Sequence, residues 1–214
     1  MLSKVNPDIK RYIEENIIPQ YGAFDLAHSF DHVGHVIRKS VDLAARMNVD
    51  IDKAYVVAAY HDLGMSGPRE SHHILSGEIL SNDMALRCWF SDDDIRQMKE
   101  AVEDHRASAC HEPRNIYGKI VADADRDLTP STVIRRTIQY GLSHYPEKSR
   151  EEQFRRMAGH LREKYSASGY LHLYFSESDN RDDLKELRRI IDNPSLLRQS
   201  FDKTFDDLTE NTYD

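Results

Sequence analysis

The sequence predicts an all-α fold. Apolar residues recur at intervals of three and four through most of the 214 residues, which is the period of a helix that buries one face. Almost no segment alternates polar with apolar residues, as a half-buried strand would. The chain is long enough to bury a sizeable core, and we expect a single domain over residues 1–214 whose C-terminal part is a helical extension.

Five helices are expected in the N-terminal half. They cover residues 7–20, residues 30–47, a segment from Asp50 or Asp52 to Gly64, residues 71–80, and a segment that begins after Ser91. Asp50 or Asp52 can cap the third helix, and Gly64 is well placed as the glycine just past its end. Ser91 and Asp94 form a capping-box pattern at the start of the fifth helix.

Five more helices are expected in the C-terminal half. They cover residues 116–125, 132–142, 150–165, 182–191 and 194–208. No internal repeat or low-complexity linker divides the chain. The residues after Asp206 are polar and acidic, and we expect them to fray.

Composition narrows the classes of function. The 37 acidic and 29 basic side chains give a net charge of −8, which disfavours binding to polymeric nucleic acid or to an anionic membrane but leaves a small anionic ligand open. Cys88 and Cys110 are too few for a disulfide framework, and the chain shows neither a signal-peptide pattern nor a run long enough to span a membrane. We therefore expect a soluble, cytoplasmic protein.

Several polar side chains fall on helix faces that otherwise look buried. They are His32, His61, His105 and Asp123, together with Asp62 beside His61. A buried carboxylate or imidazole costs free energy unless a partner compensates, and a divalent cation is the strongest such partner. A single histidine on an apolar face is more often a satisfied core residue, so it is the whole set that predicts a metal site. Because helical bundles build metal sites from inward-facing side chains, we expect these residues to converge on one centre.

The order and local context of these residues resemble the HD superfamily of metal-dependent phosphohydrolases. The resemblance is carried by residues 25–36 (DLAHSFDHVGHV), 56–64 (VVAAYHDLG) and 122–128 (ADADRDL). It implies that the metal ligands are His32, His61, Asp62 and Asp123. It also implies an HD-domain helical bundle around the metal, with the core over about residues 25–128 and the C-terminal extension over about residues 129–214.

The same resemblance allows a second metal ion. Members of the superfamily that hold two metals use extra histidines between the His-Asp pair and the last aspartate, and His73 and His105 stand in suitable places. His73 precedes Gly77 by four residues, as in the similar family stretch, which makes His72 the bystander. Imidazole and carboxylate ligands without thiolate suit Mn, Fe, Co, Ni, Zn or Mg, and manganese or iron is the first choice for a trial.

A metal-activated water would then cleave a small phosphate ester or anhydride, with a nucleotide as the favoured substrate. Asp62 is expected to be both a ligand and the acceptor of the water's proton; whether Glu70 or Asp127 assists is open. Arg126 and Arg106 are expected to hold the phosphate, because arginine can bind it through two hydrogen bonds.

Departures from better-known branches exclude some substrates. Leu63, Gly64 and Met65 follow the His-Asp pair where alarmone hydrolases carry a Glu-Asp pair, and the Gly-Tyr-Pro motif of cyclic dinucleotide phosphodiesterases is missing. Two alternatives to this hydrolysis stay open.

One alternative function is that of an HD-type di-iron oxygenase, and the other is that of a non-catalytic module that binds a metal or nucleotide. The aromatic side chains of residues 165–175 could form a homodimer contact.

Overall fold

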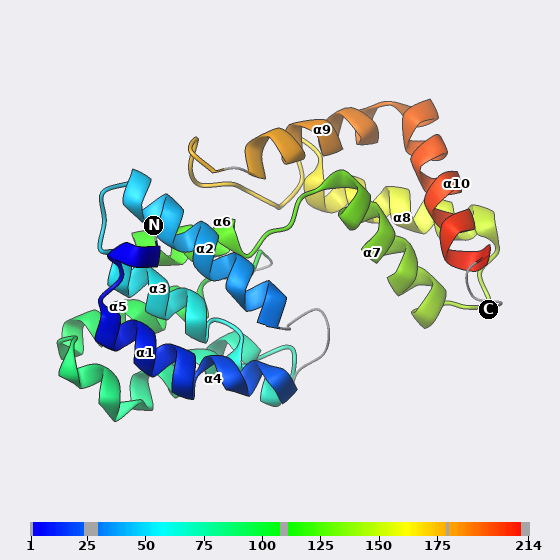
Figure 1. Cartoon of the computed structure of the whole chain (residues 1–214). Coiled ribbons are helices and arrows are strands. Elements are labelled where there is room, and N and C mark those ends of the chain that lie inside the picture. Colours follow the sequence, from blue (N-terminus) through cyan, green and yellow to red (C-terminus); the bar gives the residue numbers. More distant parts are fainter. Residues whose placement is uncertain (1, 24–29, 108–110, 179, 211–214) are drawn as a thin grey trace. The chain divides into compact units, whose positions relative to one another are not determined.

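The computed structural model describes residues 2–23, 30–107, 111–178 and 180–210. Within these ranges the chain is built from helices and contains no strand, which confirms the all-α prediction (Figure 1). Residues 25–29 of the first motif, Cys110 and the last four residues of the predicted tail lie outside the described ranges.

Contacts divide the chain into two compact units. The first unit comprises Met1–Arg126 and Tyr174–Ser178, and the second comprises Asp127–Leu173 and Asp179–Asp214. The boundary at residue 126 falls close to the expected end of the core at residue 128. The assignment of both units to one domain stays a prediction.

The first unit contains six α-helices and several short 3-10 helices among the described residues. They are η1 (Leu2–Lys4), α1 (Pro7–Asn16), η2 (Ile18–Ala23), α2 (Phe30–Arg46), α3 (Ile51–Tyr60), η4 (Leu63–Ser66), α4 (His72–Asn82), η5 (Met84–Cys88), α5 (Asp92–Glu103) and α6 (Ile116–Ala124). Of the two expected caps of α3, Asp50 is the one that accepts hydrogen bonds from backbone N–H groups, those of Asp52 and Lys53. Ser91 and Asp94 form the predicted capping box at α5.

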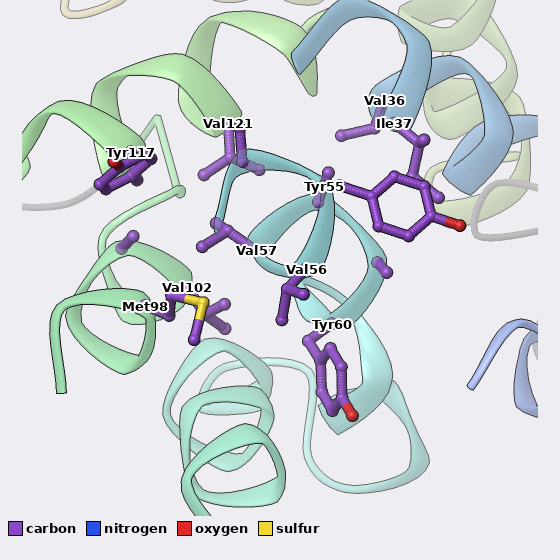
Figure 2. Close-up of a cluster of buried hydrophobic side chains, with 14 of the residues drawn as sticks. Val36, Ile37, Tyr55, Val56, Val57, Tyr60, Met98, Val102, Tyr117 and Val121 are labelled. Carbon is purple, nitrogen blue, oxygen red and sulfur yellow. The ribbon is translucent and has the colours of Figure 1, made fainter. Parts of the chain in front are cut away.

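Helix α3 lies in the middle of the core of the first unit. All its side chains from Ala54 to Tyr60 are buried, and it packs against α2, α5 and α6. Figure 2 shows side chains of these neighbours, among them Val36, Met98 and Val121, around the helix. Because the apolar helix is enclosed on several sides, the residues that follow its last turn are delivered to the interior of the unit.

Two predicted helices end about one turn earlier in the structure. Helix α1 ends at Asn16, and the 3-10 helix η2 with Pro19 replaces the last turn expected up to residue 20. Helix α3 ends at Tyr60, so Gly64 does not terminate it, and Gly64 lies in η4 without a positive φ. Glycine is needed there for a close approach: a Cβ atom would lie 2.0 Å from the carbonyl oxygen of His72.

The second unit consists of four α-helices: α7 (Pro130–His144), α8 (Arg150–Tyr165), α9 (Asn180–Asp192) and α10 (Pro194–Glu210). Leu161, Leu187 and Phe201 are among its fully buried side chains. Helices α7 and α9 each begin two residues before the predicted start, at Pro130 and Asn180. None of the helices described is long and apolar enough to cross a bilayer.

Candidate metal centre

The His-Asp pair follows directly after the last turn of α3. His61 is fully buried, and Asp62 is 4% exposed. The hydroxyl of Tyr21 donates to the carbonyl of Ala59 at 3.0 Å and accepts a hydrogen bond from the backbone N–H of Asp62 at 3.4 Å. Tyr21 therefore holds the end of α3 in place and fixes the backbone from which both side chains project.

A first cluster of possible metal ligands contains His32, His61, Asp62 and Asp125. One ligand atom of each lies within 4.8 Å of the others. The Nε2 atoms of His32 and His61 are 3.4 Å apart. Nε2 of His61 lies 3.2 Å from Oδ2 of Asp62, and Nε2 of His32 lies 3.2 Å from Oδ1 of Asp125. These residues come from α2, the end of α3 and the C-terminal cap of α6.

A second cluster shares Asp62 with the first and adds His72 and His105. Oδ1 of Asp62 lies 3.2 Å from Nε2 of His72 and 3.6 Å from Nε2 of His105. The two Nε2 atoms are 3.3 Å apart, and all three side chains are buried. Asp62 thus presents one carboxylate oxygen to each cluster.

The hydrogen bonds of the imidazoles fit a bound cation. Nδ1 of His61 lies 2.8 Å from the carbonyl of Ala58, Nδ1 of His72 lies 2.8 Å from the carbonyl of Arg69, and Nδ1 of His105 lies 2.7 Å from the carbonyl of Val102. A carbonyl can only accept, so each Nδ1 donates its proton to that carbonyl, and in a metal-bound site the lone pair of each Nε2 would face the clusters. Two such lone pairs 3.3 Å apart repel unless positive charge lies beside them.

The pKa shifts in the first cluster also indicate that it is stabilised by positive charge. Burial alone lowers the pKa of His61, but the carboxylates of Asp62 and Asp125 outweigh it and raise that pKa well above its usual value. Burial tends to raise the pKa of Asp62, and the imidazoles of His61, His105 and His32 hold it well below its usual range. The carboxylates are therefore ionised, and a proton or a divalent cation supplies the balancing charge.

The structure does not bring the predicted ligand Asp123 into either cluster, and Asp125 takes that place. Asp123 is buried as expected, but its carboxylate accepts hydrogen bonds from the backbone N–H groups of Tyr174 at 3.0 Å and Phe175 at 3.3 Å. Nη1 of Arg126 donates to it at 3.1 Å. Asp123 therefore anchors residues 174–178 to α6, and the ADADRDL motif supplies its second aspartate to the cluster.

The predicted ligand His73 is likewise outside both clusters, where its neighbour His72 stands. In the sequence, the spacing to Gly77 favours His73 over His72. The first turn of α4 instead directs His72 into the interior and leaves His73 half-buried. His105 does join the second cluster, although α5 ends at Glu103 and His105 lies just past the helix rather than on its apolar stripe.

The two predicted phosphate clamps are in different environments. The Arg126 side chain is buried, its guanidinium lies over the ring of Tyr174, and its Nε has no hydrogen-bond partner among the described residues. Arg106 is half-buried and donates to the carbonyl of Glu70. The side chain of Asp127 is 35% exposed and lies near Arg136. Catalytic roles for Arg126, Arg106, Glu70 and Asp127 stay predictions.

Comparison with known proteins found a matching family and a similar solved structure. Residues 29–129 match the family model of the HD domain, a stretch that contains every residue of the two clusters. A crystal structure of a predicted HD superfamily hydrolase from an uncultured Thermotogales bacterium aligns with 72% of this chain and 86% of its own, at 23% identity and a TM-score of 0.48. No curated protein matches the chain.

Proposed function

Because this chain is an HD-domain protein, we propose that it is a metal-dependent phosphohydrolase that cleaves a small phosphate ester or anhydride, with nucleotides as the favoured substrates. The observation that carries the proposal is the position of Asp62, whose two carboxylate oxygens each face a separate group of imidazole nitrogens. That arrangement suits two cations bridged by one carboxylate.

The described residues supply nitrogen and oxygen ligands for two ions. His32, His61, Asp62 and Asp125 would hold one, and Asp62, His72 and His105 the other. A divalent cation bound there lowers the pKa of a coordinated water and stabilises charge on a phosphoryl group. Ligands of this kind suit manganese or iron, and equally cobalt, nickel, zinc or magnesium.

Asp125 is the better-placed proton acceptor of the two cluster carboxylates. Both oxygens of Asp62 face imidazoles, and its side chain is only 5% exposed. The side chain of Asp125 is 28% exposed, and Asp125 Oδ1 is 3.2 Å from His32. A carboxylate that reaches solvent can pass the proton of an attacking water to the outside, so we assign this step to Asp125 rather than to Asp62.

Phosphate binding is assigned more readily to Arg106 than to Arg126. The guanidinium of Arg126 is committed to the buried carboxylate of Asp123, and moving it to a substrate would leave that carboxylate without its charged partner. Arg106 follows His105 of the second cluster directly and is not fully buried. Its fork of N–H donors can bind a phosphate through two hydrogen bonds.

Elemental analysis beside a phosphate-release assay tests the proposal. The purified protein is expected to hold about two ions per chain, as bridged sites do, and to release phosphate from members of a panel of nucleotides, sugar phosphates and pyrophosphate. Each divalent ion is supplied in turn. Treatment with chelator should abolish the release, and the Asp62→Ala variant should lose both metal and activity while keeping its helical content by circular dichroism.

Oxygen uptake is measured in parallel. Consumption of oxygen by an iron-loaded protein that releases no phosphate would favour the HD-type di-iron oxygenase. A protein that binds metal but neither releases phosphate nor consumes oxygen would be a non-catalytic binding module. Either result contradicts the proposed hydrolysis.

A further inference from the structure

The second unit contains a cavity with a volume of about 550 Å³. It lies between the residues that follow α8 and one face of α9. Its lining consists of Ala167, Leu171, His172, Leu173, Arg181, Asp182, Leu184, Lys185 and Arg188. None of these residues belongs to the metal centre, and the volume is within the range of pockets that hold small molecules.

One wall of the cavity is strongly basic. Arg181, Lys185 and Arg188 are separated by four and three residues along α9, so they share one face of the helix. Asp182 is the single carboxylate in the lining. Three cations beside one anion are unusual in a chain whose net charge is −8. Like charges gathered in a concave site attract a negatively charged ligand.

Two of these cations offer donors that the described part of the chain does not use. Nε of Arg188 donates to the carbonyl of Tyr165 at 3.0 Å, which orients the guanidinium, but the terminal nitrogens contact no acceptor among the described residues. Lys185 likewise has no ion pair there. Arg189, the next residue on the helix, is different because Nε and Nη2 each bind the carboxylate of Glu186 at 2.7 Å.

Apart from His172, the remainder of the lining is apolar. Leu171 and Leu184 are buried at 1% and 5% exposure, and Ala167 and Leu173 complete this part. We propose that the cavity binds a small phosphorylated molecule that also carries a ring or another apolar group. Lys185 and Arg188 bind its phosphate, and the leucines contact its apolar part. This is a second ligand site, distinct from the hydrolytic centre of the first unit.

Isothermal titration calorimetry on the full-length, metal-loaded chain tests this site. The probe is the α,β-methylene analogue of ADP, because its P–C–P bridge cannot be hydrolysed at the metal centre. Lys185→Gln and Arg188→Gln are each expected to weaken binding by about tenfold or more, the loss of one charge-assisted contact. Lys185 makes no hydrogen bond or ion pair with the described residues, so its variant reports ligand binding rather than folding. Arg189→Gln is the matched control and should leave binding unchanged.

Further titrations separate this site from the metal centre. Asp125→Asn should retain the binding event that Lys185→Gln loses. Loss of binding in Asp125→Asn with retention in Lys185→Gln would place the analogue at the metal centre and overturn the proposal. Equal losses of affinity in Lys185→Gln and Arg189→Gln would also overturn it, and so would the absence of saturable binding. Inorganic phosphate and adenosine should each bind at least about tenfold more weakly than the analogue, because each fills only one part of the cavity. Equal affinity for phosphate alone would contradict the apolar part of the assignment.

Discussion

Oδ1 of Asp62 lies 3.2 Å from Nε2 of His72, while its other carboxylate oxygen faces His61. A carboxylate shared in this way can neutralise part of the charge of two cations at once. The loss of a ligand that serves one cluster should therefore differ from the loss of Asp62, which serves both.

His72→Ala should reduce the metal content from about two ions per chain to about one, the count expected when one half of a bridged site is lost. The variant keeps His32, His61, Asp62 and Asp125, which would hold the other ion. Mass spectrometry of the purified variant, beside Asp62→Ala, measures the change. Asp62→Ala should lose both ions.

The adjacent imidazole provides the control for this prediction. His73→Ala removes the same side chain one residue further along α4, outside both clusters, and should keep both ions. Loss of one ion from His73→Ala together with full retention by His72→Ala would restore His73 as the ligand expected from the sequence.

Asp125→Asn should lower the affinity for metal, whereas Asp123→Asn should lower the free energy of unfolding. Asp125→Asn removes a charged ligand and should weaken metal binding by more than about 100-fold, since even outer-shell partners of a metal are worth 10- to 100-fold. Asp123→Asn should keep the metal but lower the free energy of unfolding by about 2 kcal/mol, because hydrogen bonds to a buried charge are lost.

Metal titration and urea unfolding separate these two outcomes. Unfolding can be followed by the fluorescence of Trp89, which is the sole tryptophan in the sequence and belongs to the first unit. Loss of metal from Asp123→Asn without loss from Asp125→Asn would show that the first aspartate of the motif is the ligand after all.

These two aspartates also show what the sequence can and cannot predict. The apolar spacing correctly indicates that Asp123 is buried, at 1% exposure. Besides the nearby Arg126, its hydrogen-bond partners are the backbone N–H groups of Tyr174 and Phe175, about fifty residues later in the chain. No local pattern in the sequence predicts that residues 174–178 belong to the first unit. Burial of a carboxylate was therefore predictable, whereas the identity of its distant backbone partners was not.

The histidines of α4 show a different limit. Most helices could be predicted because a 3.6-residue period and capping residues such as Ser91 are local signals. The choice between His72 and His73 depends on the rotation of the first turn of α4. Close packing of Gly64 against the backbone of His72 fixes that turn, and such packing is visible only in three dimensions.

Gly64→Ala should disrupt the second cluster from a distance. The added methyl group would lie 2.0 Å from the carbonyl oxygen of His72 and 2.7 Å from the backbone nitrogen of Ser76, so η4 and α4 must separate. We expect the free energy of unfolding to fall by about 3 kcal/mol, which is the upper end of the usual cost of overpacking. Binding of a metal ion by the second cluster should weaken as well. Trp89 fluorescence in urea and metal content measure both effects.

Gly34→Ala is the comparison within the same unit. The nearest atom to its added methyl group is the flexible end of Arg38 at 3.4 Å, and a helical alanine is favoured over glycine. The variant should be as stable as the parent or slightly more so. Equal stability of Gly64→Ala and the parent would mean that η4 does not pack against α4 as described.

Asp94 should give the first unit a dependence of stability on acid pH. Its hydrogen bonds with Lys53 and Ser91 lower the pKa of its carboxyl to about 2 in the folded protein. The unfolded chain takes up the proton near the ordinary value of about 4, so the stabilisation is present above that pH and is lost as the pH falls toward 2. Because the side chain is 27% exposed, solvent screening leaves about 1 kcal/mol of this effect.

At pH 6 the free energy of unfolding of Asp94→Asn should therefore be about 1 kcal/mol lower than that of the parent. The two free energies should converge as the pH falls from 4 to 2. Urea titrations of Trp89 fluorescence on chelator-treated protein measure the difference at each pH. Asp92→Asn is the control, because Asp92 lies in the same first turn of α5 and its side chain is 89% exposed. A constant gap between Asp94→Asn and the parent over this range would show that ionisation of Asp94 does not stabilise the fold.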